Sequence, residues 1–280
     1  MTARTLTGFL EQMRKRQEEL VRSRLSSRSA ASMEKVALNK EAPPDFAAAL
    51  GMPSRGRVRL IVEMKKASPS AGVIREGFEP LYLARRAVQA GASAISVLTE
   101  EEFFQGSLQD LSRVAAGVPA PVMRKDFIVD TYQLLEARVA GAAACLLIAA
   151  MLAPPQLRRL MKDAADLGMD TLVETHDRHD LDFALEAEAG IIGINNRDLK
   201  TLKVDTGTTL ELKAFVPDDR IVVSESGHRT RADLVALEGA GVQAVLIGEA
   251  VMRAEDVGAK VRELLGEPGE GPSGLGPGSG

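Results

Sequence analysis

The feature that most constrains the fold is an Ala-Gly pair that recurs at regular spacing at four places, each time just before an apolar run. The four glycines stand at positions 91, 141, 190 and 241, so they are 49 to 51 residues apart. Glycine after a helix favours the left-handed conformation that ends the helix. A continuous apolar run is typical of a strand buried on both faces. The repeat therefore predicts four units in which a helix ends at glycine and a buried parallel strand follows.

Four further apolar runs alternate with these units. They begin near residues 60, 121, 171 and 221, and an amphipathic stretch follows each of them. Eight strands and eight helices in about 210 residues favour an α/β fold, a closed (βα)8 TIM barrel, over an open sheet. No strand is followed by G-x-G-x-x-G, and a Walker-type loop is absent from the sequence, which argues further against an open nucleotide-binding sheet.

The chain divides into three segments. Residues 1–58 carry Leu6, Phe9, Leu10 and Met13 at helical spacing and then break at a Pro-Pro pair. We expect them to form an N-terminal helical extension packed on the barrel. We expect residues 59–266 to form the catalytic barrel. Residues 267–280 are mostly Gly, Pro, Ser and Glu, which predicts a disordered tail.

Composition excludes several classes of function. The net charge of −4 at pH 7 and a pI of about 5.6 argue against a nucleic-acid surface. One cysteine allows no intrachain disulfide and fits a reducing compartment. The first residues are charged, and no apolar stretch is long enough to span a bilayer. We therefore expect a cytoplasmic protein without a signal peptide or a membrane partner. The sequence is compatible with a monomer and leaves association with other enzymes open.

Polar residues close six of the eight predicted strands. In a parallel barrel the carboxyl ends of the strands meet at one mouth, where active sites lie. Taken singly, such residues are more often loop ion pairs or helix caps. Together they bring two amines, several carboxylates, an amide and a guanidinium to one place, which packing does not require. They are Glu63 and Lys65, Lys125, Glu174, Asn195 and Arg197, Glu225, Ser226 and Gly227, and Gly248 and Glu249.

The last two loops predict a phosphate site. Ser226-Gly227 and Gly248-Glu249 put small residues where backbone N–H groups can approach an anion. The alternative is that these glycines only permit tight turns. The carboxylate of Glu249 would repel phosphate, so we expect it to point away and only its backbone amide to be used.

Aromatic side chains are scarce but gather in the predicted loops. They are 4% of the residues, yet Phe78, Phe103, Phe104 and Phe127 all follow the first three strands. Such residues often cover the aromatic part of a ligand, and the alternative is that they plug the barrel top.

The histidines and the cysteine predict no metal site. His176 and His179 lie close to Asp177 and Asp180 in the sequence. Asp177, however, stands where a helix is predicted to start and is better explained as its N-cap. Cys145 begins an apolar strand and is interpreted as core.

Five motifs in order resemble the indole-3-glycerol phosphate synthase family. The resemblance extends from about residue 5 to 265 and includes the N-terminal extension. Met64, Thr175 and His228 depart from the family pattern, but none of these departures removes a functional group. The motifs are EMKKASPS from Glu63, KDFI from Lys125, GINNRDL from Gly193, SESG from Ser224 and LIGE from Leu246.

This resemblance implies a reaction without cofactor or metal. The phosphorylated substrate 1-(2-carboxyphenylamino)-1-deoxyribulose 5-phosphate would undergo ring closure, decarboxylation and dehydration to indole-3-glycerol phosphate. Ring closure turns a ketone into an alkoxide and so needs an acid, a role that the resemblance gives to Lys125. Glu174 and Glu63 would act as bases or orienting groups. Lys65 would be a second acid and would also contact the substrate carboxylate, and the sequence leaves open which of the two lysines protonates the hydroxyl group that leaves in the dehydration.

The resemblance also implies the binding residues. Arg197 would hold the carboxylate, Asn195 and Glu225 the sugar hydroxyls, Phe104 and Phe127 the aromatic ring, and Ser68, Ser226, Gly227, Gly248 and Glu249 the phosphate. One alternative is a phosphoribosylanthranilate-type aminoaldose phosphate isomerase, which would need only one acid–base pair. Another is a barrel that binds a phosphate ligand without catalysis, against which the intact ionisable groups argue.

Overall fold

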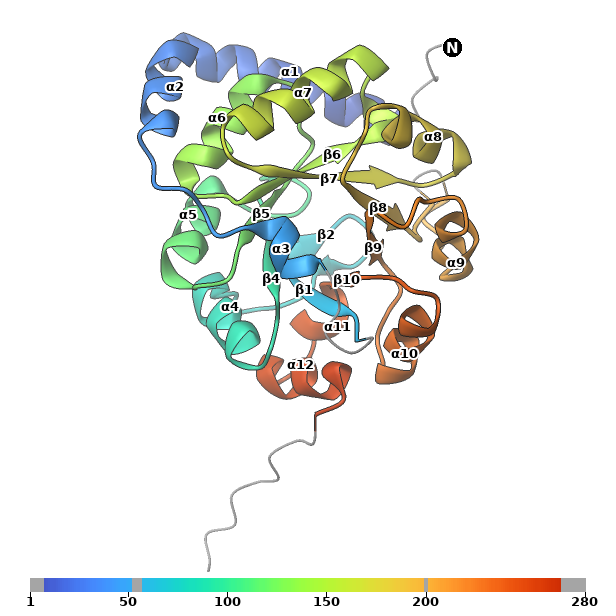
Figure 1. Cartoon of the computed structure of the whole chain (residues 1–280). Coiled ribbons are helices and arrows are strands. Elements are labelled where there is room, and N and C mark those ends of the chain that lie inside the picture. The colour runs from blue at the N-terminus through green and yellow to red at the C-terminus, as the bar shows by residue number, and fades with distance from the viewer. Residues whose placement is uncertain (1–7, 52–56, 199–200, 268–280) are drawn as a thin grey trace, which may run out of the picture.

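The structure, a computed structural model, describes residues 8–51, 57–198 and 201–267. Among these residues, eight parallel strands close into a barrel in the order β1-β10-β9-β8-β7-β6-β5-β4, which confirms the predicted TIM barrel (Figure 1). The barrel strands are β1 (Arg59–Met64), β4 (Ala94–Leu98), β5 (Val122–Lys125), β6 (Ala144–Ile148), β7 (Asp170–Thr175), β8 (Ile191–Asn195), β9 (Ile221–Glu225) and β10 (Ala244–Ile247).

Helices surround the barrel, and their apolar faces lie on its outer surface (Figure 1). Two short elements were not predicted: the hairpin β2 (Ala67–Ser68) and β3 (Gly72–Val73) after β1, and the 3₁₀ helix η2 (Ala149–Met151) after β6. The helices are α4 (Pro80–Gln89), α5 (Leu108–Gly117), α6 (Thr131–Ala140), α7 (Pro154–Asp166), α8 (Arg178–Glu186), α9 (Gly207–Lys213), α10 (Arg231–Gly239), α11 (Glu249–Met252) and α12 (Val257–Leu265).

Three of the four repeated glycines end their helices as expected. Gly91, Gly141 and Gly241 have φ angles of 104°, 93° and 71°, in the left-handed region. Gly190 does not, and the prediction was wrong there. The left-handed residue after α8 is Glu188, with a φ of 62°. The helix therefore stops two residues earlier than the glycine suggested, and the next amide, that of Ala189, bonds back to the carbonyl of residue 184.

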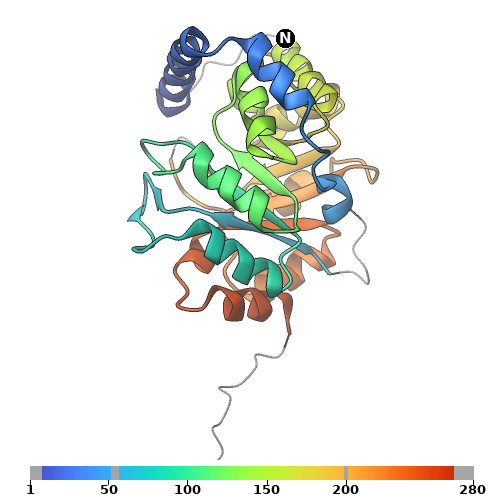
Figure 2. The same cartoon turned by 90° about the vertical axis from the view of Figure 1, so that its left-hand side faces the viewer.

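The N-terminal residues form three helices, α1 (Gly8–Ser27), α2 (Ala30–Leu38) and α3 (Phe46–Leu50). Figure 2, which is turned by 90° from Figure 1, shows α1 and α2 at one side of the barrel. The buried face of α1 includes Leu10 and Met13, at the predicted spacing. At the other end, α3 is fixed where β7 begins, because the amide of Ala47 donates to Asp170 at 2.9 Å. The segment boundaries at residues 58 and 266 stay predictions, and the expected tail from 268 onward lies outside the described residues.

A buried ion network ties α1 to the barrel. Arg124 of β5 is only 1% exposed and contacts Asp126 at 2.9 Å and Glu136 of α6 at 3.2 Å. From α1, Gln17 donates to Asp126 at 3.3 Å and Arg24 pairs with Glu136 at 3.0 Å. Because buried charges are costly unless paired, this network fixes the extension against the loop that follows β5.

Across residues 8–51, 57–198 and 201–267, no helix combines the length and the apolar character needed to cross a membrane.

Candidate active site

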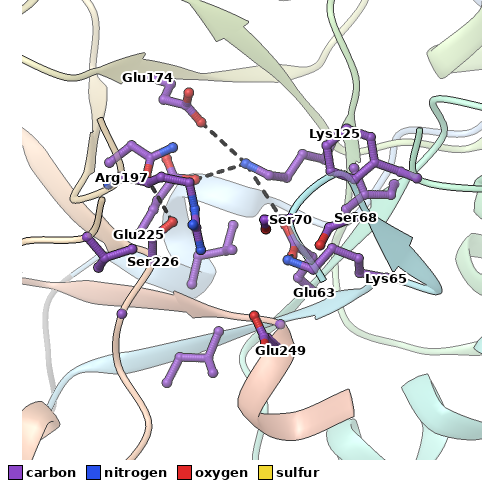
Figure 3. Close-up of a pocket in the computed structure, with 18 of the residues that line it drawn as sticks. Glu63, Lys65, Ser68, Ser70, Lys125, Glu174, Arg197, Glu225, Ser226 and Glu249 are labelled. Carbon is purple, nitrogen blue, oxygen red and sulfur yellow. Dashed lines mark hydrogen bonds and ion pairs between the residues drawn. The ribbon is translucent and has the colours of Figure 1, made fainter. Parts of the chain in front are cut away.

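A cavity of about 530 Å³ opens at the carboxyl ends of the barrel strands. Its size is in the range of small-molecule sites. Figure 3 shows charged side chains from several strands pointing into it. The structure brings together all the residues predicted for the site. Those that line the cavity are Glu63, Lys65, Ser68, Phe104, Lys125, Phe127, Glu174, Asn195, Arg197, Glu225, Ser226, Gly227, Gly248 and Glu249.

The centre of the cavity is the ammonium group of Lys125, at the end of β5. Its Nζ lies 3.0 Å from Glu225, 3.3 Å from Glu174 and 4.0 Å from Glu63 (Figure 3). These carboxylates come from β9, β7 and β1, so the closed barrel is what brings them to one amine. Burial disfavours the charged amine, but the three carboxylates outweigh it and hold the pKa of Lys125 above its usual range.

Glu63 connects the two lysines. Its Oε1 lies 2.5 Å from the Nζ of Lys65, and its Oε2 faces Lys125. Both amines therefore contact one carboxylate and can reach one shared ligand. Glu63 and Lys65 do form an ion pair, which is the structural role that the sequence left open for such residues, but the pair is part of a larger cluster.

The carboxylates of the cluster are not equivalent. Burial raises the pKa of Glu225 to about 7, with a contribution from Glu174 and against the pull of Lys125. Burial acts in the same direction on Glu174, but Lys125 and His176 outweigh it and hold the pKa of Glu174 below its usual range. One carboxyl group is thus set to exchange a proton near neutral pH while its neighbour stays ionised, the separation that acid–base catalysis requires.

The loop after β9 has an unusual backbone. Ser226 and Gly227 both lie in the left-handed region, with φ angles of 67° and 92°. The hydroxyl of Ser226 donates to Asn195 Oδ1 at 2.8 Å, which fixes the turn. A Cβ at position 227 would lie within 3.0 Å of the side chains of Val204 and Thr206. This glycine is therefore needed for both its conformation and its close packing.

Gly248 has a different reason to be glycine. Its φ of −112° suits any residue. A Cβ there would instead come within 3.0 Å of the Oε1 atom of Glu63. The sequence suggested that Gly248 lets a ligand approach the backbone or permits a tight turn. Neither explanation includes its contact with Glu63. The glycine makes room for a carboxylate of the cluster.

Glu249 is the first residue of α11. Its carboxylate pairs with Arg253 at 2.9 Å. Burial opposes ionisation, but Arg253 holds the pKa of Glu249 below its usual range. The negative charge next to the predicted phosphate loop is therefore paired with the cation that follows the last residue of α11.

The aromatic wall of the cavity differs partly from the prediction. Phe104 and Phe127 pack with their ring centroids 6.2 Å apart, and both line the cavity. Phe78 and Phe103, although expected in the same group, are not among the lining residues. Instead Phe9 from α1 lines it and packs on Phe127 at 6.0 Å. Sequence reasoning assigned Phe9 to ordinary helix packing, because spacing alone cannot show which helix lies at the mouth.

The loop after β8 contributes lining residues that the sequence did not single out. Arg197 belongs to this loop, and its guanidinium donates to the carbonyl of Leu202 at 3.0 Å.

The loop after β9 adds Arg229, which follows the Ser226-Gly227 turn. Its position next to the predicted phosphate loop was the only sign in the sequence that it could line the cavity. The further lining residues include Ser70, Leu202, Val204, Asp205, Thr206, His228 and Arg229.

The histidines are explained by protein contacts. Asp177 caps α8 as predicted, since its side chain accepts from the amide of Asp180 at 2.9 Å. Ligand atoms of Asp177, His179 and Asp180 lie within 4.8 Å of one another, a closeness that the helix start itself produces. His228 is buried, and its Nε2 lies 2.7 Å from Ser224 Oγ. Cys145 is fully buried, as expected of a core residue.

An ammonium among three carboxylates at the carboxyl mouth of a parallel barrel defines the class: a TIM-barrel enzyme that moves protons. Comparison with known proteins narrows the class. The family model described as Indole-3-glycerol phosphate synthase matches residues 10–264, and the chain belongs to this family.

Individual relatives carry the name of the same family. An Indole-3-glycerol phosphate synthase of Dehalococcoides mccartyi (strain CBDB1) is 53% identical over 220 residues, which cover 77% of this chain and 85% of that protein. One of Rhodopirellula baltica is 47% identical over 239 residues, which cover 85% and 92%. A crystal structure of KGPDC from Streptococcus mutans has a TM-score of 0.59 at 14% identity, covers 74% of this chain and 95% of that chain, and supports the fold alone.

Proposed function

We propose that the protein converts 1-(2-carboxyphenylamino)-1-deoxyribulose 5-phosphate to indole-3-glycerol phosphate, carbon dioxide and water, a step of tryptophan biosynthesis. Family membership supports this activity. The observation that carries it is the Lys125 ammonium at 3.0 Å from Glu225 and 3.3 Å from Glu174, beside a second amine at Glu63. The reaction needs more than one proton transfer, and this cluster offers several donors and acceptors.

Lys125 is the proposed acid for ring closure. The ring carbon of the anthranilate part attacks the ketone carbon, a carbon–carbon bond forms, and the ketone oxygen takes the proton of the ammonium group. The carboxylate then leaves as carbon dioxide, and its bonding electrons return to the ring. Because Lys125 contacts carboxylates on several sides, it has neighbours that can restore its proton.

Dehydration needs a second acid and a base. The new hydroxyl group leaves as water when it is protonated, and a proton is lost to form the aromatic indole. Lys65 and Glu63, in contact at 2.5 Å, are the proposed acid and its partner. Glu174 and Glu225 are the other candidate bases, and the pKa of Glu225, about 7, suits the exchange of a proton.

Binding groups surround this cluster in the proposed complex. The guanidinium of Arg197 suits a carboxylate with two acceptor oxygens. Asn195 and Glu225 orient the sugar hydroxyls, and Phe104 and Phe127 cover the aromatic ring. Backbone amides of the turns after β9 and β10, together with Ser68 of the β2–β3 hairpin, hold the phosphate. These residues are Ser68, Ser226, Gly227, Gly248 and Glu249.

Neither alternative is favoured. An aminoaldose phosphate isomerase needs one acid–base pair, whereas two lysines and three carboxylates share this cavity. A barrel that only binds phosphate would have no use for an amine buried among carboxylates, which is costly to maintain.

The direct test is to add the carboxyphenylamino substrate and to follow indole fluorescence. The chain contains no Trp, so the background is low. We expect emission to rise in proportion to enzyme concentration. No emission with substrate of verified identity would contradict the proposal.

Location and assembly are also proposed. The single buried cysteine fits a reducing compartment, which supports a cytoplasmic enzyme. Lys125 and the three carboxylates that contact it form the charged cluster within a single copy of the chain, so the proposed chemistry requires no residue of a second copy and is compatible with a functional monomer. If the active enzyme is a dimer and not a monomer, its sedimentation would show this.

A further inference from the structure

His176 lies directly behind the catalytic cluster. Its ring has Nε2 3.1 Å from Glu174 Oε1 and Nδ1 3.4 Å from Asp180 Oδ2. The side chain is only 9% exposed, and that of Asp180 is fully buried. Glu174 and His176 are two residues apart at the end of β7, so their side chains leave the backbone on the same side. The motifs in the sequence gave this histidine no role.

Asp180 is held firmly where it meets the ring. It lies in the first turn of α8, where its amide donates to Asp177 Oδ1 at 2.9 Å. Its Oδ2 atom, besides facing the ring, accepts from the backbone amide of His176 at 3.1 Å. The start of a helix also favours a negative charge. The ring therefore lies between a fixed carboxylate and a catalytic one.

A carboxylate beside each ring nitrogen determines the form of the imidazole. A neutral ring carries one N–H group, so it would turn a lone pair toward one of the two carboxylates. A doubly protonated ring instead places its positive charge within ion-pair distance of both carboxylates. Burial disfavours that charged ring, but Asp180 and Glu174 outweigh burial and raise the pKa of His176 to about 9.

The two oxygens of Glu174 are thus occupied by two different cations. Oε1 faces His176, and Oε2 faces Lys125 at 3.3 Å. Charges alternate in sign from Asp180 through the ring and Glu174 to the catalytic amine. Glu63 likewise lies between two cations, Lys65 and Lys125, but both of them face the cavity, whereas the second cation of Glu174 lies behind it.

We propose that His176 is a positioning residue that, anchored by Asp180, holds Glu174 ionised and turned toward Lys125. The proposal rests on the proposed function for its catalytic consequence. Without the ring, Glu174 loses its fixed orientation and competes with Glu225 for the proton that the reaction moves. The residue does not touch the substrate, because it lies behind Glu174 and is not among the residues that line the cavity.

The first experiment needs neither substrate nor turnover. The chain has three histidines, so ¹⁵N NMR of the ring nitrogens in the parent protein can be assigned with His176→Gln, His179→Gln and His228→Gln. We expect the ring of His176 to be protonated on both nitrogens at about pH 7.5 and to lose its proton only well above that pH. A ring that is neutral under these conditions overturns the proposal. Because the NMR measurement is made on the parent protein, it tests the proposal even if His176→Gln does not fold.

The second experiment measures kcat, KM and their pH dependence for His176→Gln. We expect kcat to fall about tenfold or more because Glu174 is misplaced, with KM within about twofold. The acidic limb of the kcat profile should move to higher pH, because Glu174 loses a cation and becomes easier to protonate. The matched control is His179→Gln, which changes an exposed histidine of α8 that packs on Phe183 at 4.3 Å.

The two experiments separate the possible failures. If the kcat and acidic limb of His176→Gln equal those of the parent, or if the control changes them equally, the proposal is overturned even with a charged ring. If the parent itself makes no indole product, the proposed function is wrong, while the NMR result still reports whether His176 is held as a cation.

Discussion

Gly193, in the middle of β8, offers a sharp test of how tightly the catalytic carboxylates are packed. A Cβ at this position would lie within 3.0 Å of both Glu225 Oε1 and Leu172 Cδ2. Ordinary contact would require shifts of about 1 Å. Leu172 belongs to β7 and is fully buried, so it has little room to move. In Gly193→Ala we therefore expect the carboxylate of Glu225 to move away from Lys125.

The expected magnitudes follow from this geometry. Overpacking of a closed core costs about 1–3 kcal/mol of unfolding free energy. Displacement of a catalytic group by about 1 Å lowers turnover by about 100-fold. Unfolding in urea measures the first quantity, and indole fluorescence at saturating substrate measures kcat per folded enzyme. The matched control is Gly190→Ala, since a Cβ at position 190, just before β8, meets no atom within 4 Å.

A clear result would refute this reasoning. If folded Gly193→Ala keeps kcat within about twofold of the parent, the position of Glu225 is not critical to the reaction. If Gly190→Ala loses as much activity as Gly193→Ala, the effect comes from the strand and not from the carboxylate.

Three further predictions concern the charged groups. Lys125→Ala should lower kcat by about 100-fold or more, as expected for the loss of a general acid, while binding of inorganic phosphate persists; unchanged kcat would remove Lys125 from the mechanism. The folded pKa of Glu225, about 7, exceeds its ordinary value of 4.5, so this group lowers stability as pH rises through that interval. Urea unfolding should show that Glu225→Gln gains stability relative to the parent between these pH values, and a difference that does not vary with pH would contradict the assignment. Arg124→Met should cost about 3–5 kcal/mol in the same assay, because it removes the buried cation that Asp126 and Glu136 share and leaves Glu136 with Arg24 alone; a loss below about 1 kcal/mol would mean that the carboxylates find other partners.

The barrel could be predicted because its signals are local. Each strand is a short apolar run, and most of the preceding helices end at a glycine that only needs its own φ angle to be positive. Even this signal failed at Gly190, because Glu188 adopts the left-handed conformation in its place, at a modest energetic cost. The site could be predicted because parallel strands must bring their carboxyl ends together, so Glu63, Lys125 and Glu225 were expected to meet.

What the sequence could not reveal depends on contacts between distant residues. Phe9 reaches the cavity only because α1 is held at the mouth by Gln17 and Asp126, which are 109 residues apart. Gly193 and Gly248 resemble ordinary strand and turn glycines until the carboxylates beside them are seen. His176 received no role from the sequence, because only the fold shows that its ring lies between Glu174 of β7 and Asp180 of α8.

Two adjacent residues of strand β5 point to opposite sides of the sheet and carry different cations. Lys125 points into the cavity, and Arg124 points outward to α6 and, through Glu136 and Asp126, to α1. A slip of this strand by one position would put a guanidinium among the carboxylates and an amine where a five-donor fork is needed. Because each cation matches only its own side of the sheet, the pair disfavours any slip of β5 by one residue against its neighbours.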